Sequence, residues 1–217
     1  MDRRIFIGGA AFALVSTVAR ADDEFRGDDG KPAPTWRLPS EISLDMPGLI
    51  VAGGASPDAI LYEFFDYNCP WCKKSEGDLH RLVSGDKEFS LRLVQNAILS
   101  LGSVQAAKIA MAARLLTDDK RAYALHRAML GHRGQIDGMG ALDHARKLGF
   151  DAKALEEKAD SEDLRKLLTL HTQTSRALAM DATPSFAMNG TGVGGWPGPK
   201  SIASMVKNVR ACERISC

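Results

Sequence analysis

The stretch "FFDYNCPWCKKS", residues 64–75, contains two cysteines, Cys69 and Cys72, separated by Pro70 and Trp71. It begins inside the apolar run "AILYEFF", which is typical of a buried strand. It leads into "KKSEGDLHRLVSG", in which the apolar residues have the spacing of a helix. The sequence therefore predicts that Cys69 lies where a strand ends and a helix begins.

That position determines the chemistry expected of the two thiols. The first turn of a helix has unpaired amide hydrogens and the positive end of the helix dipole, and both stabilise a thiolate. We therefore expect Cys69 to be the exposed, attacking thiol, with a pKa below the ~8.5 of a free cysteine. Pro70 suits a first turn because its missing N–H is not needed there. Cys72, one turn further, is expected to be the protected thiol that resolves a mixed disulfide.

Three kinds of site compete for such a pair of cysteines. A zinc site needs two more ligands at matched spacing, and the sequence has no second C-x-x-C or paired-histidine motif. A purely structural disulfide would close a very small loop and add little stability. A redox pair explains the position and the spacing together, so the motif favours that interpretation.

Residues 1–21 have the layout of a secretory signal peptide. Arg3 and Arg4 form a basic start, residues 5–18 are apolar, and "ARA" offers a cleavage site before an acidic segment. A membrane anchor is the alternative, but the apolar run is shorter than the about 20 residues that a spanning helix requires. We expect cleavage after Ala21 and a periplasmic location, reached by the general secretory or the twin-arginine route. The periplasm is an oxidising compartment, in which cysteines can form disulfides that persist.

The charge of the exported part is nearly balanced. Without residues 1–21, the 28 basic and 27 acidic residues of the chain become 25 and 26, a formal charge of −1. This balance does not indicate a nucleic acid or an anionic membrane surface as a partner. The remaining length suits a single domain with one core.

The rest of the chain predicts the order strand, strand, helix, strand, helical block, hairpin, helix. The ranges are 48–51, 59–65, 70–85, 89–95, about 103–180, 185–196 and 199–211. Ser103, Asp118 and Ser161 are the expected N-caps within the block. This is an α/β thioredoxin-like layout over residues 49–211, with a large all-helical insertion before the hairpin. A flexible or extended arm at 22–48 precedes it, and a tail at 212–217 follows it.

Several other side chains also have an expected place in the fold. His126 and His132 are expected at the surface without a metal. The glycine-rich segment 190–198 is expected to form a hairpin and the start of a helix, with contact to a substrate as the alternative. The methionines at 111, 129, 180 and 188 are expected in the core.

The motifs "EFFDYNCPWC" and "ATPSFAMNG", with the helical insertion between them, resemble the DsbA-like family of exported thiol–disulfide oxidoreductases. "NAILSLGSVQAAKIAMAA" is similar to the start of the insertion in that family. The resemblance covers about residues 50–211. It implies that Thr183–Pro184 is a cis peptide beside the two cysteines, with Pro184 keeping substrates and metals off the sulfurs. It also implies that Glu63 is a partly buried acid beneath the dithiol that assists proton transfer. The alternative for Glu63 is an edge-strand carboxylate that faces water.

Two features depart from parts of that family. The arm at 22–48 lacks the helical periodicity of the segment that oligomerises several isomerase-like relatives, so we expect a monomer. Trp71 is neither the histidine of strongly oxidising members nor the tyrosine common in isomerase-like members. The redox potential of the family is therefore not transferable.

The sequence and the resemblance together predict an exported disulfide oxidase rather than an isomerase or a reductase. It would form mixed disulfides with exported client proteins, need no cofactor, and be recycled by an unidentified redox partner. The alternative is a protein of the same fold that holds Cu(I) or an unfolded client between the two sulfurs. Cys212 and Cys217 are expected to form a structural disulfide that takes no part in turnover.

Overall fold

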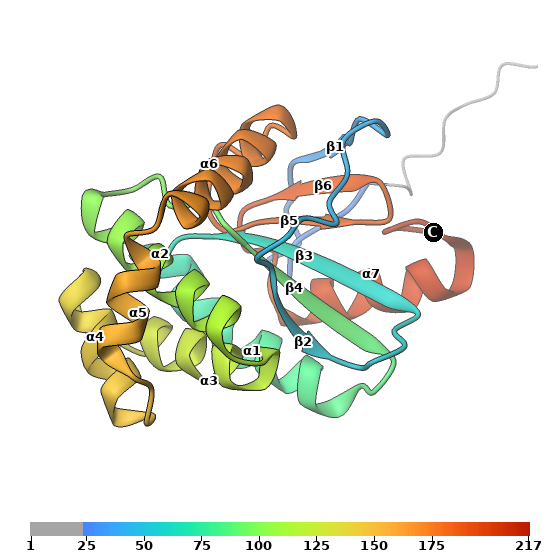
Figure 1. Cartoon of the computed structure of the whole chain (residues 1–217). Coiled ribbons are helices and arrows are strands. Elements are labelled where there is room, and N and C mark those ends of the chain that lie inside the picture. Colours follow the sequence, from blue (N-terminus) through green and yellow to red (C-terminus); the bar gives the residue numbers. More distant parts are fainter. Residues whose placement is uncertain (1–23) are drawn as a thin grey trace, which may run out of the picture.

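The structure, a computed structural model, describes residues 24–217. The expected signal peptide and the first two residues of the arm lie outside the described residues. One mixed sheet has the strand order β1-β6-β5-β3-β4-β2, and the helices surround it (Figure 1). The strands are β1 (Thr35–Arg37), β2 (Ile50–Gly53), β3 (Ala59–Phe65), β4 (Phe89–Gln95), β5 (Ser185–Met188) and β6 (Thr191–Gly194). The helices are α1 (Pro70–Gly85), α2 (Leu101–Leu116), α3 (Asp119–Leu130), α4 (Gly138–Lys147), α5 (Ala152–Ala159), α6 (Glu162–Ala177) and α7 (Pro199–Cys212).

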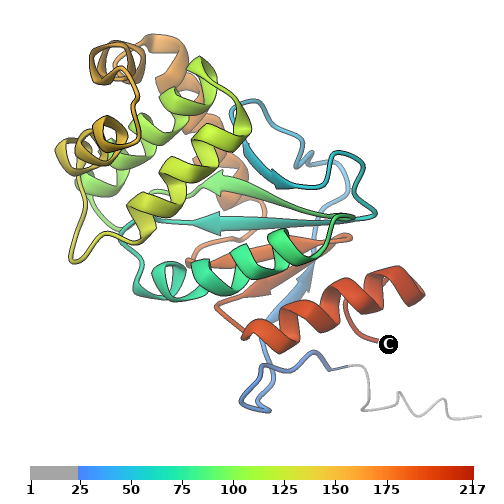
Figure 2. The ribbon, with the colours of Figure 1, turned by 90° about the horizontal axis from the view of Figure 1, so that it is seen from below.

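Strand β3 lies inside the sheet, parallel to β4 and antiparallel to β5. It is buried on both faces, because Leu61 and Phe65 belong to one core cluster and Phe64 to another. Helices α1 and α7 lie side by side on one face of the sheet (Figure 2). The parallel β3–α1–β4 unit, the β5–β6 hairpin and α7 confirm the predicted thioredoxin-like layout.

The insertion consists of α2 to α6 and gathers at one side of the sheet (Figure 1). Alanines fill the buried face of α2, which lets neighbouring helices approach closely. Asp118 and Ser161 are N-caps, as predicted. The N-cap of α2 is Ser100 rather than Ser103, because the Ser100 hydroxyl accepts a hydrogen bond from the Ser103 amide and the helix starts earlier.

The N-terminal arm, for which a flexible or extended segment was expected, contains strand β1. Strand β1 pairs with β6, and the Trp36 indole N–H donates to the Leu178 carbonyl at 2.9 Å. A Cβ at position 192 would collide with the Trp36 ring, so Gly192 makes room for it. The strand is only three residues long and pairs with a distant partner, so local periodicity does not reveal it.

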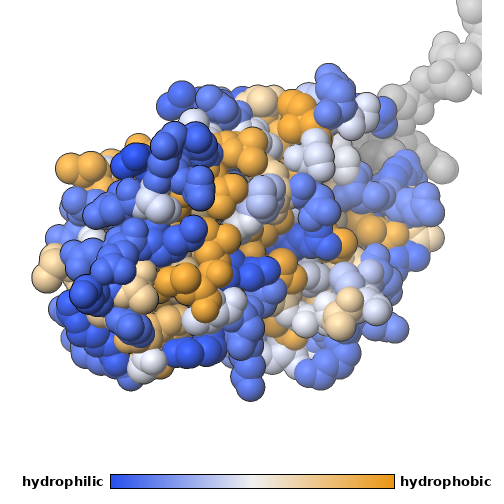
Figure 3. All heavy atoms as spheres, viewed as in Figure 1, coloured by the Kyte–Doolittle hydropathy of each residue, from blue (hydrophilic) through white to orange (hydrophobic). Residues whose placement is uncertain are grey.

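Within residues 24–217, no helix is long and apolar enough to cross a membrane. On the face seen in Figure 3, hydrophobic patches are scattered among hydrophilic residues.

The second core cluster lies on the face of the sheet that the arm covers. Its buried members are Leu38, Met46, Leu49, Phe64, Val94, Leu178, Met180 and Ala187.

Candidate active site

The two cysteines lie at the junction between β3 and α1, as predicted. Cys69 is the N-cap of α1, with φ −76° and ψ 120°, and Pro70 is in the first turn. No side chain caps this end of the helix. The amide groups of the first turn are therefore available to the Cys69 sulfur.

The two thiols have opposite electrostatic environments. Hydrogen bonding with Cys72 is the largest effect on Cys69, and it outweighs burial; with Thr183 and two backbone amides, it lowers the pKa of Cys69 to about 6. Burial raises the pKa of Cys72 far above its ordinary value, and the charge of Glu63 acts in the same direction. At neutral pH, Cys69 is therefore mainly a thiolate and Cys72 a thiol.

The expectation that Cys69 is exposed is wrong for this conformation, in which both thiols are free. Cys69 is 3% exposed and Cys72 is fully buried. The Cys69 Sγ lies 3.0 Å from the Thr183 carbonyl oxygen, so the loop before β5 lies against the sulfur. The difference between the two thiols thus resides in their hydrogen bonds more than in their exposure.

The Thr183–Pro184 peptide bond is cis, which confirms the expectation from the family resemblance. It directly precedes β5, and the Pro184 carbonyl accepts a hydrogen bond from Gly195 at 3.0 Å. Pro184 is buried, whereas Thr183 is partly exposed. The contact between Thr183 and Cys69 brings this peptide beside the dithiol.

Glu63 lies in the middle of the sheet, opposite Leu93 and Phe186 on the neighbouring strands. The alternative of an edge-strand carboxylate is wrong, because β3 is an interior strand and Glu63 is 1% exposed. Its Oε1 atom is buried without a hydrogen-bond partner. Burial, followed by the negative charges of Cys69 and Glu76, raises the pKa of Glu63 to about 8. The carboxyl group is therefore mainly protonated at neutral pH.

Exposed apolar side chains lie on two segments next to the dithiol, the first turn of α1 and residues 98–101, and together they are called the apolar surface below. The sequence-based prediction did not include this surface. Trp71 is 53% exposed, with the Lys74 ammonium 4.6 Å from its ring centroid. The amides of Ile98 and Leu99 donate to the buried Asp66 carboxylate, which holds this loop against the turn before Cys69. The exposed apolar members of this surface are Trp71, Ile98, Leu99 and Leu101. The signal available in the sequence was "AILSL", apolar residues between a strand and a helix that no element buries.

The expectation that both histidines lie at the surface is wrong for His126. His126 is buried, not at the surface, and its Nδ1 lies 3.2 Å from the Tyr67 hydroxyl in an aromatic cluster. His132 is half-buried and contacts His144. No group of three or more His, Cys, Asp or Glu side chains in the described part of the chain is arranged to hold a metal ion. The four methionines lie in the core, as expected.

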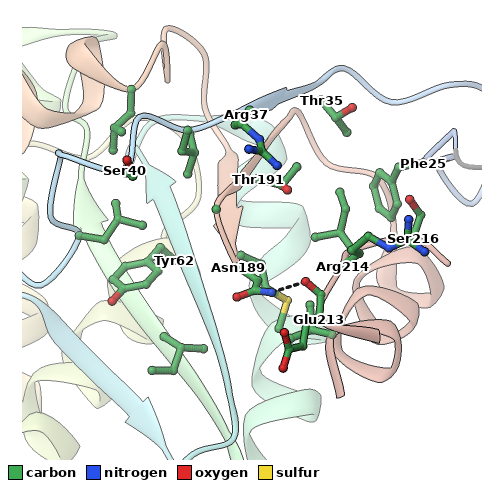
Figure 4. A pocket seen from close by; sticks show the side chains of 18 of the residues that line it. Phe25, Thr35, Arg37, Ser40, Tyr62, Asn189, Thr191, Glu213, Arg214 and Ser216 are labelled. Carbon is green, nitrogen blue, oxygen red and sulfur yellow. Dashed lines mark hydrogen bonds between the residues drawn. The ribbon is translucent and has the colours of Figure 1, made fainter. Parts of the chain in front are cut away.

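A groove of about 860 Å³ is lined by residues of the N-terminal arm, β3, the β5–β6 turn and the C-terminal tail. Figure 4 shows it between Tyr62 and Ser40 on one side and Asn189, hydrogen-bonded to Glu213, on the other. Neither Cys69 nor Cys72 lines it, so we assign it no part in thiol exchange. Residues 213–216, which form one wall, are enclosed by the Cys212–Cys217 disulfide, whose Cα atoms are 6.6 Å apart.

A thioredoxin-like fold with an acidic thiol at a helix start, a buried thiol one turn later and an adjacent cis-proline defines a thiol–disulfide oxidoreductase. Comparison with known families agrees, since the model of the DSBA-like thioredoxin domain matches residues 60–210. The chain belongs to this family. No curated protein sequence matches it.

Solved structures are similar over most of the chain. A thioredoxin-like oxidoreductase from Silicibacter pomeroyi is 31% identical, with a TM-score of 0.68, over 76% of this chain and 94% of that one. The thiol-disulfide exchange protein alpha-DsbA2 from Wolbachia pipientis is 22% identical, with a TM-score of 0.69, over 77% and 88%. The catalytic domain of Proteus mirabilis ScsC is 20% identical, with a TM-score of 0.70, over 77% and 92%. The last two likenesses concern the fold alone.

Proposed function

We propose that this chain is an exported disulfide oxidase that introduces disulfide bonds into other exported proteins. The observation that carries the proposal is the position of Cys69 at the N-cap of α1, beside the fully buried Cys72. This position agrees with a pKa of Cys69 lowered to about 6 and a pKa of Cys72 that burial raises. A stabilised thiolate stabilises the reduced form, and this makes the disulfide form a stronger oxidant.

The reaction starts from the oxidised chain, with Cys69 bonded to Cys72. A client thiolate attacks the Cys69 sulfur, the Cys69–Cys72 bond breaks, and the Cys72 sulfur leaves with the electron pair. A second client thiolate then attacks the client sulfur of the mixed disulfide, and Cys69 leaves as a thiolate. The client loses two electrons, the chain gains them, and an unidentified redox partner takes them up again.

Glu63 would supply the proton that the first step needs. Cys72 is a poor leaving group as a thiolate because its site is buried and close to Glu63. A carboxyl group with a pKa of about 8 is protonated at pH 7 and can protonate the departing sulfur. Pro184 would keep other sulfurs and metals from approaching the pair freely.

The apolar surface around the dithiol would accept unfolded clients. Trp71, Leu99 and Leu101 are 53%, 52% and 73% exposed. Unfolded chains present apolar side chains, so such a surface would bring diverse clients to Cys69 without sequence selectivity. No cofactor enters this chemistry, since the electrons pass from sulfur to sulfur.

Export and a monomeric state belong to the same proposal. The signal-like layout of residues 1–21 supports export to the periplasm. A periplasmic thioredoxin-like protein from Salmonella enterica has a similar fold, with a TM-score of 0.70. N-terminal sequencing of exported protein is expected to give Asp22 as the first residue, and retention of residues 5–18 in membranes would contradict it.

A trapping experiment tests the function. In the Cys72→Ser variant, Cys69 is first activated as a mixed disulfide with a small aromatic thiol. A reduced client peptide with a single cysteine should displace that thiol and accumulate as a Cys69–client mixed disulfide, since neither Cys72 nor a second client thiol can resolve it. The Cys69→Ser variant should trap nothing. A mixed disulfide that forms with the Cys69→Ser variant, or with neither variant, would contradict the roles assigned to Cys69 and Cys72. A Cu(I) titration of the reduced protein tests the alternative of a copper-holding function.

A further inference from the structure

The side chain of Asn68, the residue directly before Cys69, closes onto the loop between α3 and α4. Its Oδ1 accepts a hydrogen bond from the Ile136 amide at 2.7 Å, and its Nδ2 donates to the Ile136 carbonyl at 2.9 Å. Nδ2 also donates to the Ser103 hydroxyl at 3.1 Å. One side-chain amide thus pairs with both backbone groups of a single residue 68 positions away and anchors to α2 as well.

Further hydrogen bonds, to Asp66 before Cys69 and from Lys73 after it, also hold the turn that carries Cys69. The Asn68 amide donates to the Asp66 carboxylate at 2.7 Å, and the Cys69 amide donates to the Asp66 carbonyl at 3.1 Å. In the first turn of α1, the Lys73 ammonium donates to the His132 carbonyl at 3.0 Å. The α3–α4 loop is therefore hydrogen-bonded to residues on both sides of Cys69, namely Asn68 and Lys73.

We propose that Asn68 is a positioning residue that holds the Cys69 sulfur at the start of α1, because its hydrogen bonds to Ile136 and Ser103 fix the peptide that precedes Cys69. The inference rests on the proposed function, in which Cys69 is the attacking thiol. Backbone amides of Trp71 and Cys72 contribute to the low pKa of Cys69. Those contacts require that the Cys69 sulfur stay over the start of α1, and the rotation of the preceding peptide decides where the sulfur lies.

The expected size follows from the strength of such contacts. A hydrogen bond to a charged group is worth about 1.5–3 kcal/mol, and about 1.4 kcal/mol corresponds to one pH unit of pKa. Partial loss of the amide contacts in Asn68→Ala should therefore raise the pKa of Cys69 by about one pH unit. At pH 7, a rise from about 6 to about 7 makes the reduced form about fivefold less favoured, or roughly 20 mV more negative in potential.

The competing explanation is that Asn68 only stabilises the fold. The hydrogen bonds of its side-chain amide to Ile136 and Ser103 link the active-site turn to the insertion, so Asn68→Ala should lower thermal stability under either explanation. Only the positioning role predicts a change in the pKa of Cys69. Asn208 provides a matched control, because its side-chain amide donates to the Ile215 carbonyl at 3.0 Å near the end of α7.

The test measures the pKa of Cys69 by the pH dependence of iodoacetamide labelling of reduced protein, for wild type, Asn68→Ala and Asn208→Ala. Asn68→Ala should raise the pKa and shift the glutathione equilibrium, whereas Asn208→Ala should change neither. Ser103→Ala removes one partner of Asn68 and leaves the other contacts, so it should give a smaller shift in the same direction.

Two results would overturn the inference: an unchanged pKa in folded Asn68→Ala, or an equal shift in Asn208→Ala. If Asn68→Ala does not fold, Ser103→Ala decides, and an unchanged pKa there counts against the positioning role. The labelling readout needs no client. A wild-type protein that labels at low pH but oxidises no client would therefore contradict the proposed function and leave the role of Asn68 measurable.

Discussion

Helices α1 and α7 begin in the same way and are used differently. Each has a proline in its first turn and no cap from its own N-cap side chain, at Cys69 and Gly198 respectively. At α7, the carboxylate of Asp28 in the arm binds the free amides. It accepts hydrogen bonds from the backbone N–H groups of Ser201 at 2.7 Å and Lys200 at 3.1 Å. A Cβ at position 198 would collide with that carboxylate, so glycine permits the contact.

At α1 no carboxylate occupies the corresponding place. The sulfur of Cys69 lies there instead, so the same positive end stabilises a group that reacts. The comparison shows that the start of a helix binds anions in general. A carboxylate bound there stabilises the fold, whereas a thiolate bound there becomes a reactive group. The second cysteine pair supports this, because Cys212 ends α7, where the unpaired groups are carbonyls that do not stabilise an anionic sulfur.

The largest expected effect comes from the proton source beneath the reactive helix start. Glu63→Gln keeps the size of the side chain but removes the acid, so oxidation of a dithiol peptide at pH 7 should slow by about 100-fold, the usual lower scale of general acid catalysis. Stopped-flow tryptophan fluorescence measures the rate. Glu162→Gln, at an exposed ion pair with Lys166, is the control, and an equal rate in both variants would contradict the role.

The free energy of unfolding of Glu63→Gln, measured as a function of pH, tests whether burial raises the pKa of Glu63. The pKa of Glu63 is raised to about 8 in the folded state from 4.5, so its stabilising contribution is complete below pH 4.5 and is lost as the pH rises through 8. Relative to wild type, Glu63→Gln should therefore gain stability with rising pH, by up to about 3 kcal/mol at pH 7. Urea unfolding at pH 5 and pH 7 gives the difference, and a parallel pH dependence in both proteins would refute it.

A smaller effect is expected at the far end of α7. Replacing Cys212 and Cys217 by Ser should lower the free energy of unfolding by about 2 kcal/mol, the loop-entropy value for a small closed loop. Thiol exchange should stay within about twofold of wild type, because that end of the helix offers sulfur no stabilising amides. Calorimetry and insulin reduction measure the two quantities. A collapse in exchange would give this pair a redox role.

The smallest effect is expected at the start of α7. Asp28→Ala should cost about 1 kcal/mol, as lost helix caps do, without changing exchange. Burial acts to raise the pKa of Asp28, but hydrogen bonds from Ser201 and Lys200 outweigh it and lower the pKa below 3.8. The stabilisation is thus present above pH 3.8 and lost as the pH falls through the lower folded value. Asp29→Ala, which removes only a local contact with Lys31, should change stability little. Equal losses in both variants would argue against the cap.

The sequence predicted the reactive helix start because everything that defines it is local. An apolar strand, two cysteines and a helix follow one another within residues 59–85, and their order places Cys69 at the N-cap. The cis Thr183–Pro184 bond and the burial of Glu63 were accessible only through the family resemblance, since a strand periodicity does not tell an interior strand from an edge strand.

What the sequence did not predict depends on contacts between distant residues. Asp28 caps a helix 173 positions later, and Asn68 pairs with Ile136 across 68 positions. The pairing of β1 with β6 and the burial of His126 are of the same kind. No local pattern marks such partners, because polar side chains of these types are equally common at free surfaces.

The reduction potential of the Cys69–Cys72 couple tests the central claim, that the start of α1 makes this dithiol an oxidant. It is measured by equilibrating the protein in glutathione buffers at pH 7 and separating the two forms after acid quenching. We predict a potential above about −180 mV, the value typical of protein disulfide isomerase, since a thiolate with a pKa of about 6 stabilises the reduced form. A potential near the roughly −270 mV of thioredoxin would contradict it.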